Sequence, residues 1–98
     1  MSNITKNEIR LLALQHKRRR WIVRSTRFFI STLSGSQADD EKTGVKTALA
    51  AFADGATAAN AIYQGFDAAR RQIKARLYIE SEQLLINLIN SQAKHYIH

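Results

Sequence analysis

The segment Gln64-Gly65-Phe66-Asp67-Ala68 decides how the C-terminal half of this 98-residue chain folds. A glycine just past one helix and an aspartate at the start of the next would form a helix–helix turn. The apolar spacing argues for a continuous helix instead, because intervals of four and seven residues run through this segment in an eleven-residue repeat. The residues of this repeat are Ile62, Phe66, Ile73, Leu77, Leu84 and Leu88.

We predict a turn at Gly65-Phe66-Asp67 and therefore an all-α protein, a small helical bundle of three long helices. The helices are expected near residues 5–33, 37–64 and 68–95, in a single domain over residues 1–98. One helix of about 50 residues would run roughly 75 Å and leave too little chain to cover it. The alternative is a helical hairpin with one very long C-terminal helix, which we expect to be dimeric.

The starts of the first two helices have local signals. Thr5 and Glu8 have the spacing of a capping box, so the first helix begins just after Thr5. It can run unbroken as far as Ser34-Gly35-Ser36, because the chain contains no proline. Ser36 and Asp39 repeat the capping-box spacing, which predicts that the second helix begins near residue 37.

The residues from Thr47 to Gln64 match part of the pattern of a DNA-binding helix–turn–helix. Gly55 would suit the turn of such a motif, but Asp54 occupies a position that should be apolar. The segment that would read the bases, residues 57–64, contains no basic side chain. We therefore predict an ordinary alanine-rich packing helix in this region.

The positive charge of the chain lies in its first third. The net charge is +7, and residues 1–33 hold eight basic side chains against Glu8 alone. Residues 34–98 hold seven basic and seven acidic side chains, which cancel. Such asymmetry indicates a local electrostatic surface for a negatively charged partner.

At about 100° per residue, the first helix separates into an apolar and a basic face. The predicted apolar face comprises Ile4, Leu11, Leu12, Ile22, Phe29, Ile30 and Leu33. The opposite face, which we call the cationic ridge, comprises Lys6, Arg10, Lys17, Arg20, Arg24 and Arg27, with Trp21 and Phe28 along one edge. Arg18 and Arg19 are expected to border the apolar face, with their methylenes on the core and their guanidiniums in water.

The cationic ridge predicts a small regulatory protein that binds nucleic acid through its phosphates, and not an enzyme. The candidate binding residues are Lys6, Arg10, Lys17, Arg18, Arg19, Arg20, Trp21, Arg24 and Arg27. The alternative is a protein-binding module (an inhibitor, adaptor or subunit) that docks the ridge on an acidic protein surface. Its apolar C-terminal helix would supply the interface candidates Leu85, Ile86 and Ile89, or meet a second copy. Contact with an anionic lipid surface and a solvated face without a partner are the remaining interpretations.

Other classes of chemistry have little support in the sequence. The chain has no cysteine, which excludes disulfides and thiolate metal sites. No phosphate-binding glycine loop and no hydrolase or zinc-protease motif occurs, so we predict no catalytic residue, metal or cofactor. The uncharged segments are shorter than the ~18 residues that span a bilayer, so we expect no integral membrane association. The absence of disulfides fits the cytoplasm.

Overall fold

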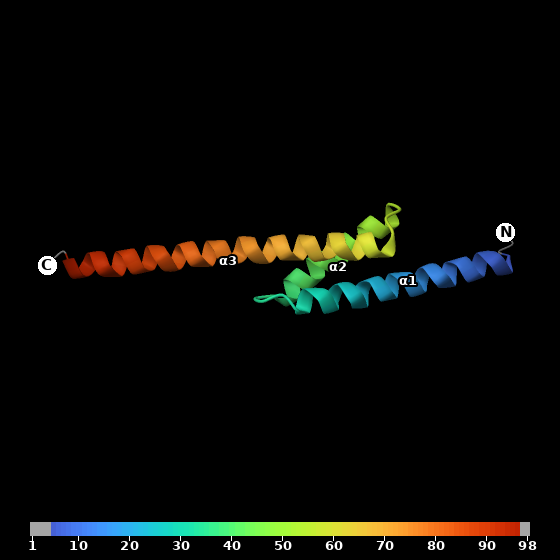
Figure 1. Ribbon diagram of the computed structural model, residues 1–98, viewed down its shortest axis with the longest axis horizontal. Coiled ribbons are helices and arrows are strands. Elements are labelled where there is room, and N and C mark those ends of the chain that lie inside the picture. Colours follow the sequence, from blue (N-terminus) through green and yellow to red (C-terminus); the bar gives the residue numbers. More distant parts are fainter. Residues whose placement is uncertain (1–4, 97–98) are drawn as a thin grey trace.

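The computed structural model describes residues 5–96, which form three helices (Figure 1). They are α1 (Lys6–Ser31), α2 (Ala38–Ala53) and α3 (Ala58–Tyr96). The expected all-α bundle of three helices is confirmed, and no strand occurs within these residues. The lengths differ from expectation, because α2 has 16 residues and α3 has 39.

The turn between α2 and α3 lies at residues 54–57, so the predicted turn at Gly65-Phe66-Asp67 is wrong. Gly55 adopts a φ of 102°, a left-handed conformation that favours glycine. Thr57 then caps α3, because its Oγ1 accepts a hydrogen bond of 3.2 Å from the backbone N–H of Asn60. The predicted bounds 37–64 and 68–95 are therefore also wrong, and the bundle includes the very long C-terminal helix of the alternative.

Gly65 lies inside α3 because α2 crosses α3 closely at this point. A Cβ atom on Gly65 would lie 2.8 Å from the Cβ of Ala48 and would overlap the carbonyl oxygen of Gly44. Gly44 is itself buried, and a Cβ atom there would overlap Cδ1 of Ile30. The two glycines therefore serve close helix packing, and neither ends a helix.

The two helix starts differ in how far they follow expectation. The capping box of α1 is confirmed, since the Glu8 N–H donates to Thr5 Oγ1 and the Thr5 N–H donates to the Glu8 carboxylate. For α2, the predicted capping pair Ser36 and Asp39 is wrong by one residue. Gln37 occupies the position before α2, and its N–H donates to Asp40 Oδ2 at 2.8 Å.

Asp40 is a buried carboxylate that joins three parts of the chain. Both of its oxygens accept hydrogen bonds from the Arg76 guanidinium, at 2.8 and 2.7 Å, and Gln72 Nε2 donates at 2.9 Å. Arg76 also donates to the carbonyl oxygen of Gly35 at 2.7 Å. Hydrogen bonds from Arg76 hold the pKa of Asp40 at about 2, below its ordinary 3.8. This network ties the α1–α2 loop and the start of α2 to the middle of α3.

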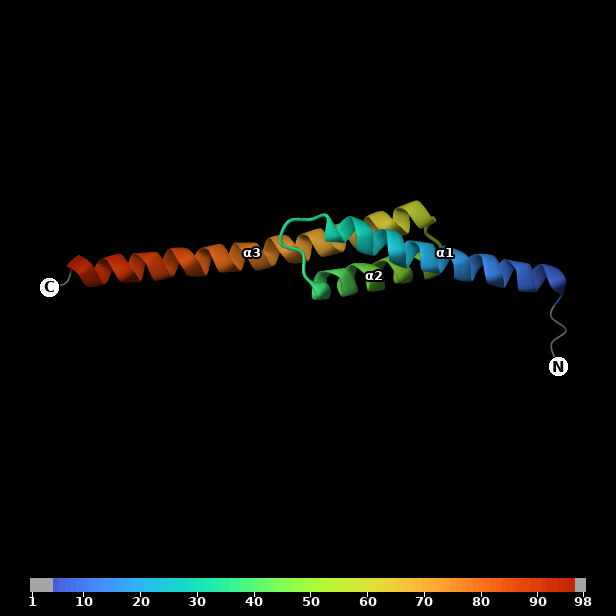
Figure 2. The same cartoon turned by 90° about the horizontal axis from the view of Figure 1, so that it is seen from below.

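The core occupies only the region where all three helices overlap. Its apolar residues are Ile22, Ile30, Ala48, Ala61, Ile62, Ala69 and Ile73. Beyond this region two helical arms project from opposite ends of the bundle (Figures 1 and 2). We define the N-terminal arm as residues 6–21 and the C-terminal arm as residues 78–96. The molecule consequently measures 84 × 26 × 18 Å.

The predicted apolar face of α1 is only half correct. Ile22 and Ile30 are buried as expected, and Leu33 is half-buried. Leu11 and Leu12 are 60% and 59% exposed, because they lie on the N-terminal arm beyond the reach of α2 and α3. Phe29 is also exposed, and Ile4 lies outside the described residues.

Candidate nucleic-acid interface

The basic residues of α1 are all solvent-exposed. They are Lys6, Arg10, Lys17, Arg18, Arg19, Arg20, Arg24 and Arg27. Within residues 5–96, the ion pairs join Arg70 and Arg71 to Asp67 and Arg76 to Asp40. No cation of α1 takes part in any of them. The ridge therefore presents its positive charge without compensation from the described part of the chain.

Four consecutive cations, residues 17–20, encircle α1 just before it enters the bundle. Successive side chains on a helix are about 100° apart, so four of them cover the whole circumference. No side of this turn can therefore face a core without burying a charge. This explains why the bundle begins one turn later, at Ile22. Of the four, Lys17 and Arg20 belong to the cationic ridge, whereas Arg18 and Arg19 lie off it.

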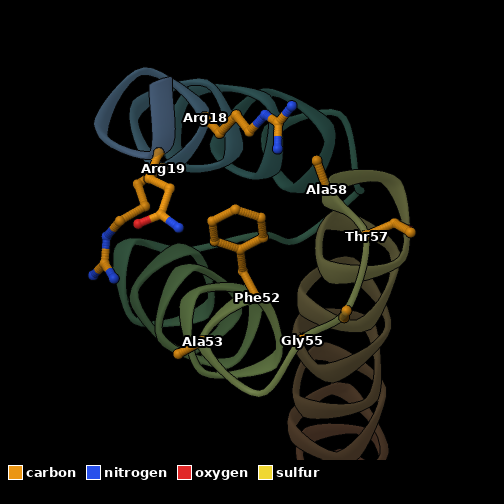
Figure 3. A pocket seen from close by; sticks show the side chains of 9 residues that line it. Arg18, Arg19, Phe52, Ala53, Gly55, Thr57 and Ala58 are labelled. Atoms are coloured by element: carbon orange, nitrogen blue, oxygen red, sulfur yellow. The ribbon is translucent and has the colours of Figure 1, made fainter. Parts of the chain in front are cut away.

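Arg18 and Arg19 line a groove of about 720 Å³ at the point where the N-terminal arm leaves the bundle. Its other wall comes from the end of α2 and the α2–α3 turn, including Phe52 and Thr57 (Figure 3). Figure 3 shows the two guanidiniums diverging on either side of the Phe52 ring. As expected, both arginines lie next to apolar surface, but that surface is the open rim of the bundle.

A second hollow, of about 250 Å³, is formed by residues of α1 alone. Lys17, Arg20, Trp21 and Arg24 line it, and the indole of Trp21 is exposed. An exposed aromatic ring among three cations can stack on a base or a sugar while the cations contact phosphates. This hollow brings together four of the residues that the sequence singles out. Lys6 and Arg10 lie further out on the arm.

The two surfaces predicted from the sequence lie far apart. Leu85, Ile86 and Ile89 are exposed on the C-terminal arm, at the opposite end of the molecule from the N-terminal arm (Figure 1). One partner surface of ordinary size cannot cover both. Ile9 and Leu14 are also exposed on the N-terminal arm, and neither belongs to the apolar face predicted for α1.

Other kinds of site were sought over the same residues. Residues 5–96 contain no group of three or more histidine, aspartate or glutamate side chains that could hold a metal ion. None of the described helices is both long enough and apolar enough to cross a membrane. No family model, curated protein or solved structure matches this chain. The fold and the charge distribution define a three-helix protein with a basic projecting helix.

Proposed function

We propose that this protein is a small, non-enzymatic regulatory protein of the cytoplasm that binds nucleic acid through α1. The carrying observation is the row of exposed, uncompensated cations on a helix that extends beyond its own bundle. Contacts to phosphates give such binding little base-sequence preference. Arginine, which dominates the ridge, bonds phosphate oxygens in pairs through its planar guanidinium.

The shape of the N-terminal arm supports this proposal. Residues 6–20 form about 21 Å of helix, and the major groove of duplex DNA is about 12 Å wide and admits a helix. The cations that encircle α1 at residues 17–20 can reach phosphates on both sides of such a groove. Trp21 adds a stacking surface next to Arg20 and Arg24.

The proposal is tested by fluorescence anisotropy with unrelated labelled duplexes at increasing salt concentration. Binding should weaken steeply, with a log–log slope of about 0.9 for each phosphate contact. The triple variant Arg20→Ala, Arg24→Ala, Arg27→Ala should bind much more weakly and with a shallower slope. A matched triple variant, Lys42→Ala, Lys46→Ala, Lys74→Ala, removes the same charge from exposed positions on α2 and α3. Equal losses in both triples, or no binding at low salt, would contradict the proposal.

A second candidate function is docking on an acidic protein, and a separate observation favours it. Ile9, Leu11, Leu12 and Leu14 are exposed on the N-terminal arm beside its cations. Phosphate contacts leave these side chains in water, whereas an apolar groove with an acidic rim would cover them. The double variant Leu11→Ser, Leu12→Ser separates the two functions. It should leave nucleic-acid affinity unchanged and weaken a protein complex formed through this arm.

A further inference from the structure

One apolar stripe of α3 continues from the core into solvent. Along it, Ile62 and Ile73 are 8% and 4% exposed, whereas Leu77, Leu84 and Leu88 are 42%, 64% and 60% exposed. Gly35, in the α1–α2 loop, lies next to Leu77, since a Cβ atom there would be 3.5 Å from Leu77 Cδ1. The stripe therefore loses its cover where α1 ends and α2 begins, while the pattern that builds the core persists for three further turns.

The C-terminal arm is apolar over more than half of its circumference. Its large exposed apolar residues are Tyr78, Ile79, Leu84, Leu85, Ile86, Leu88 and Ile89. Its charged residues are Glu80, Glu82 and Lys94, which sum to −1. A helix with so wide an apolar face is ordinarily covered by another helix.

The surface area of the chain leaves room for such a partner. Its accessible surface is 7985 Å², whereas a compact monomer of 11.1 kDa exposes about 5,700 Å². Its radius of gyration is 21.5 Å, against about 13 Å for a compact domain of this length. The excess surface is about 2,300 Å², and a stable dimer takes only about 800 Å² from each chain.

We propose that two copies of this chain pair through their C-terminal arms, antiparallel, in a symmetric dimer. Charge favours the C-terminal arm as the interface, because the N-terminal arm holds six cations against Glu8 and would repel its own copy. Pairing the N-terminal arm of one copy with the C-terminal arm of another would bury cations of residues 17–20. It would also be a head-to-tail contact, which joins copies into a ring or an open filament.

The antiparallel direction follows from the space beside the arm. The α1–α2 loop lies next to Leu77, at the end of the bundle. A partner helix that continues the core must therefore lie along the arm beyond Leu77, with its end against this loop. An antiparallel partner arm fits this space, and Leu84 of each copy then faces Leu88 of the other. The bundles and N-terminal arms, which together hold all of the net positive charge, lie at opposite ends of the dimer. A parallel pair would place them side by side.

The oligomeric state and shape in solution test this proposal. Sedimentation equilibrium on the full chain should give twice the monomer mass. Small-angle X-ray scattering should give a radius of gyration of about 35 Å. This value is calculated for two chains whose antiparallel arms lie side by side, with a rise of 1.5 Å per residue. The double variant Leu84→Glu, Leu88→Glu should sediment as a monomer that remains folded, because neither leucine contributes to the core. The matched variant Leu11→Glu, Leu12→Glu should remain a dimer.

A wild-type chain that remains a monomer at the highest concentration measured would overturn the proposal and leave the arm to another partner. The proposal is also wrong if the chain forms a filament, or if only the variant Leu11→Glu, Leu12→Glu loses the dimer. Either result would show that pairing runs through the N-terminal arm.

Disulfide trapping tests the direction, since the wild-type chain has no cysteine. Ser81 precedes Leu84 by three residues and Ser91 follows Leu88 by three, on the same stripe. Under mild oxidation, a mixture of Ser81→Cys and Ser91→Cys chains should give mainly the mixed disulfide. Efficient trapping of each variant with itself would show parallel arms and overturn the antiparallel dimer.

Discussion

At the scale of single residues, the Asp40 network makes stability depend on pH in a defined direction. The folded-state pKa of Asp40, about 2, lies below its ordinary 3.8. The unfolded chain therefore takes up this proton first, so the contribution of the network is complete above about pH 4 and is lost as pH falls through 2. Urea midpoints should fall over this window in wild type. The urea midpoint of the variant Asp40→Asn should fall less over the same pH range, because this variant lacks the carboxylate that takes up the proton.

The same variant should also cost about 3 kcal/mol of unfolding free energy at pH 7, because it leaves Arg76 without its carboxylate. Asp39→Asn is the matched control, since Asp39 is exposed and lies outside the network. If Asp39→Asn reproduces the effects of Asp40→Asn, general charge and not the network sets the pH dependence.

Thr26 provides a residue-scale prediction of the opposite sign. Its side chain is fully buried, and within residues 5–96 its Oγ1 has no hydrogen-bond partner. Thr26→Val keeps the shape and removes the unsatisfied hydroxyl. Unfolding free energy should rise by about 1 kcal/mol and the melting temperature by about 4–8 °C. Thr26→Ser, which keeps the hydroxyl and loses the methyl group, should lower both. A less stable Thr26→Val variant in thermal melts would contradict this account.

At the scale of helices, local helix propensity and tertiary packing predict opposite changes in stability for a substitution at Gly65. Helix propensity alone predicts that Gly65→Ala stabilises α3 by about 1 kcal/mol. The approach of Gly44 and Ala48 predicts the reverse, a loss of about 1–3 kcal/mol from overpacking. Urea denaturation decides between them. Gln64→Ala, at the exposed neighbouring position, should be close to neutral.

The helix boundaries show how far local signals predict this fold. The capping box at Thr5 and Glu8 places the start of α1 correctly, because both partners lie within one turn. Gly55 follows Asp54, and Gly65 stands two residues before Asp67, so local sequence allows a turn at either position. The choice depends on Gly65 meeting Gly44, a contact between different helices. The eleven-residue repeat through Phe66 was the better guide, because it reflects the continuous helix itself.

At the scale of the whole molecule, the unequal helix lengths decide which residues are covered. The ridge and the four adjacent cations of residues 17–20 are exposed, as their charge predicts. Leu11 and Ile22 share one apolar face in the sequence, yet only Ile22 is buried. The apolar spacing of α1 runs through the four cations of residues 17–20 without a break, so that spacing alone does not show where the cover by α2 and α3 stops. The groove between Arg18, Arg19 and Phe52 was missed for the same reason, because it exists only at that end of the bundle.

This division into bundle and arms predicts that helix breakers act very differently in the two parts. Ala13→Pro lies on the N-terminal arm and should disrupt the helix there, with little change in the urea midpoint of the bundle. It should weaken nucleic-acid binding, because Lys6 and Arg10 lose their alignment with Lys17. Ala50→Pro lies at an exposed position within α2 and should cost about 3 kcal/mol or more. Circular dichroism and urea denaturation measure both effects. A cooperative loss of the whole fold in Ala13→Pro would mean that the arm belongs to the same folding unit as the core.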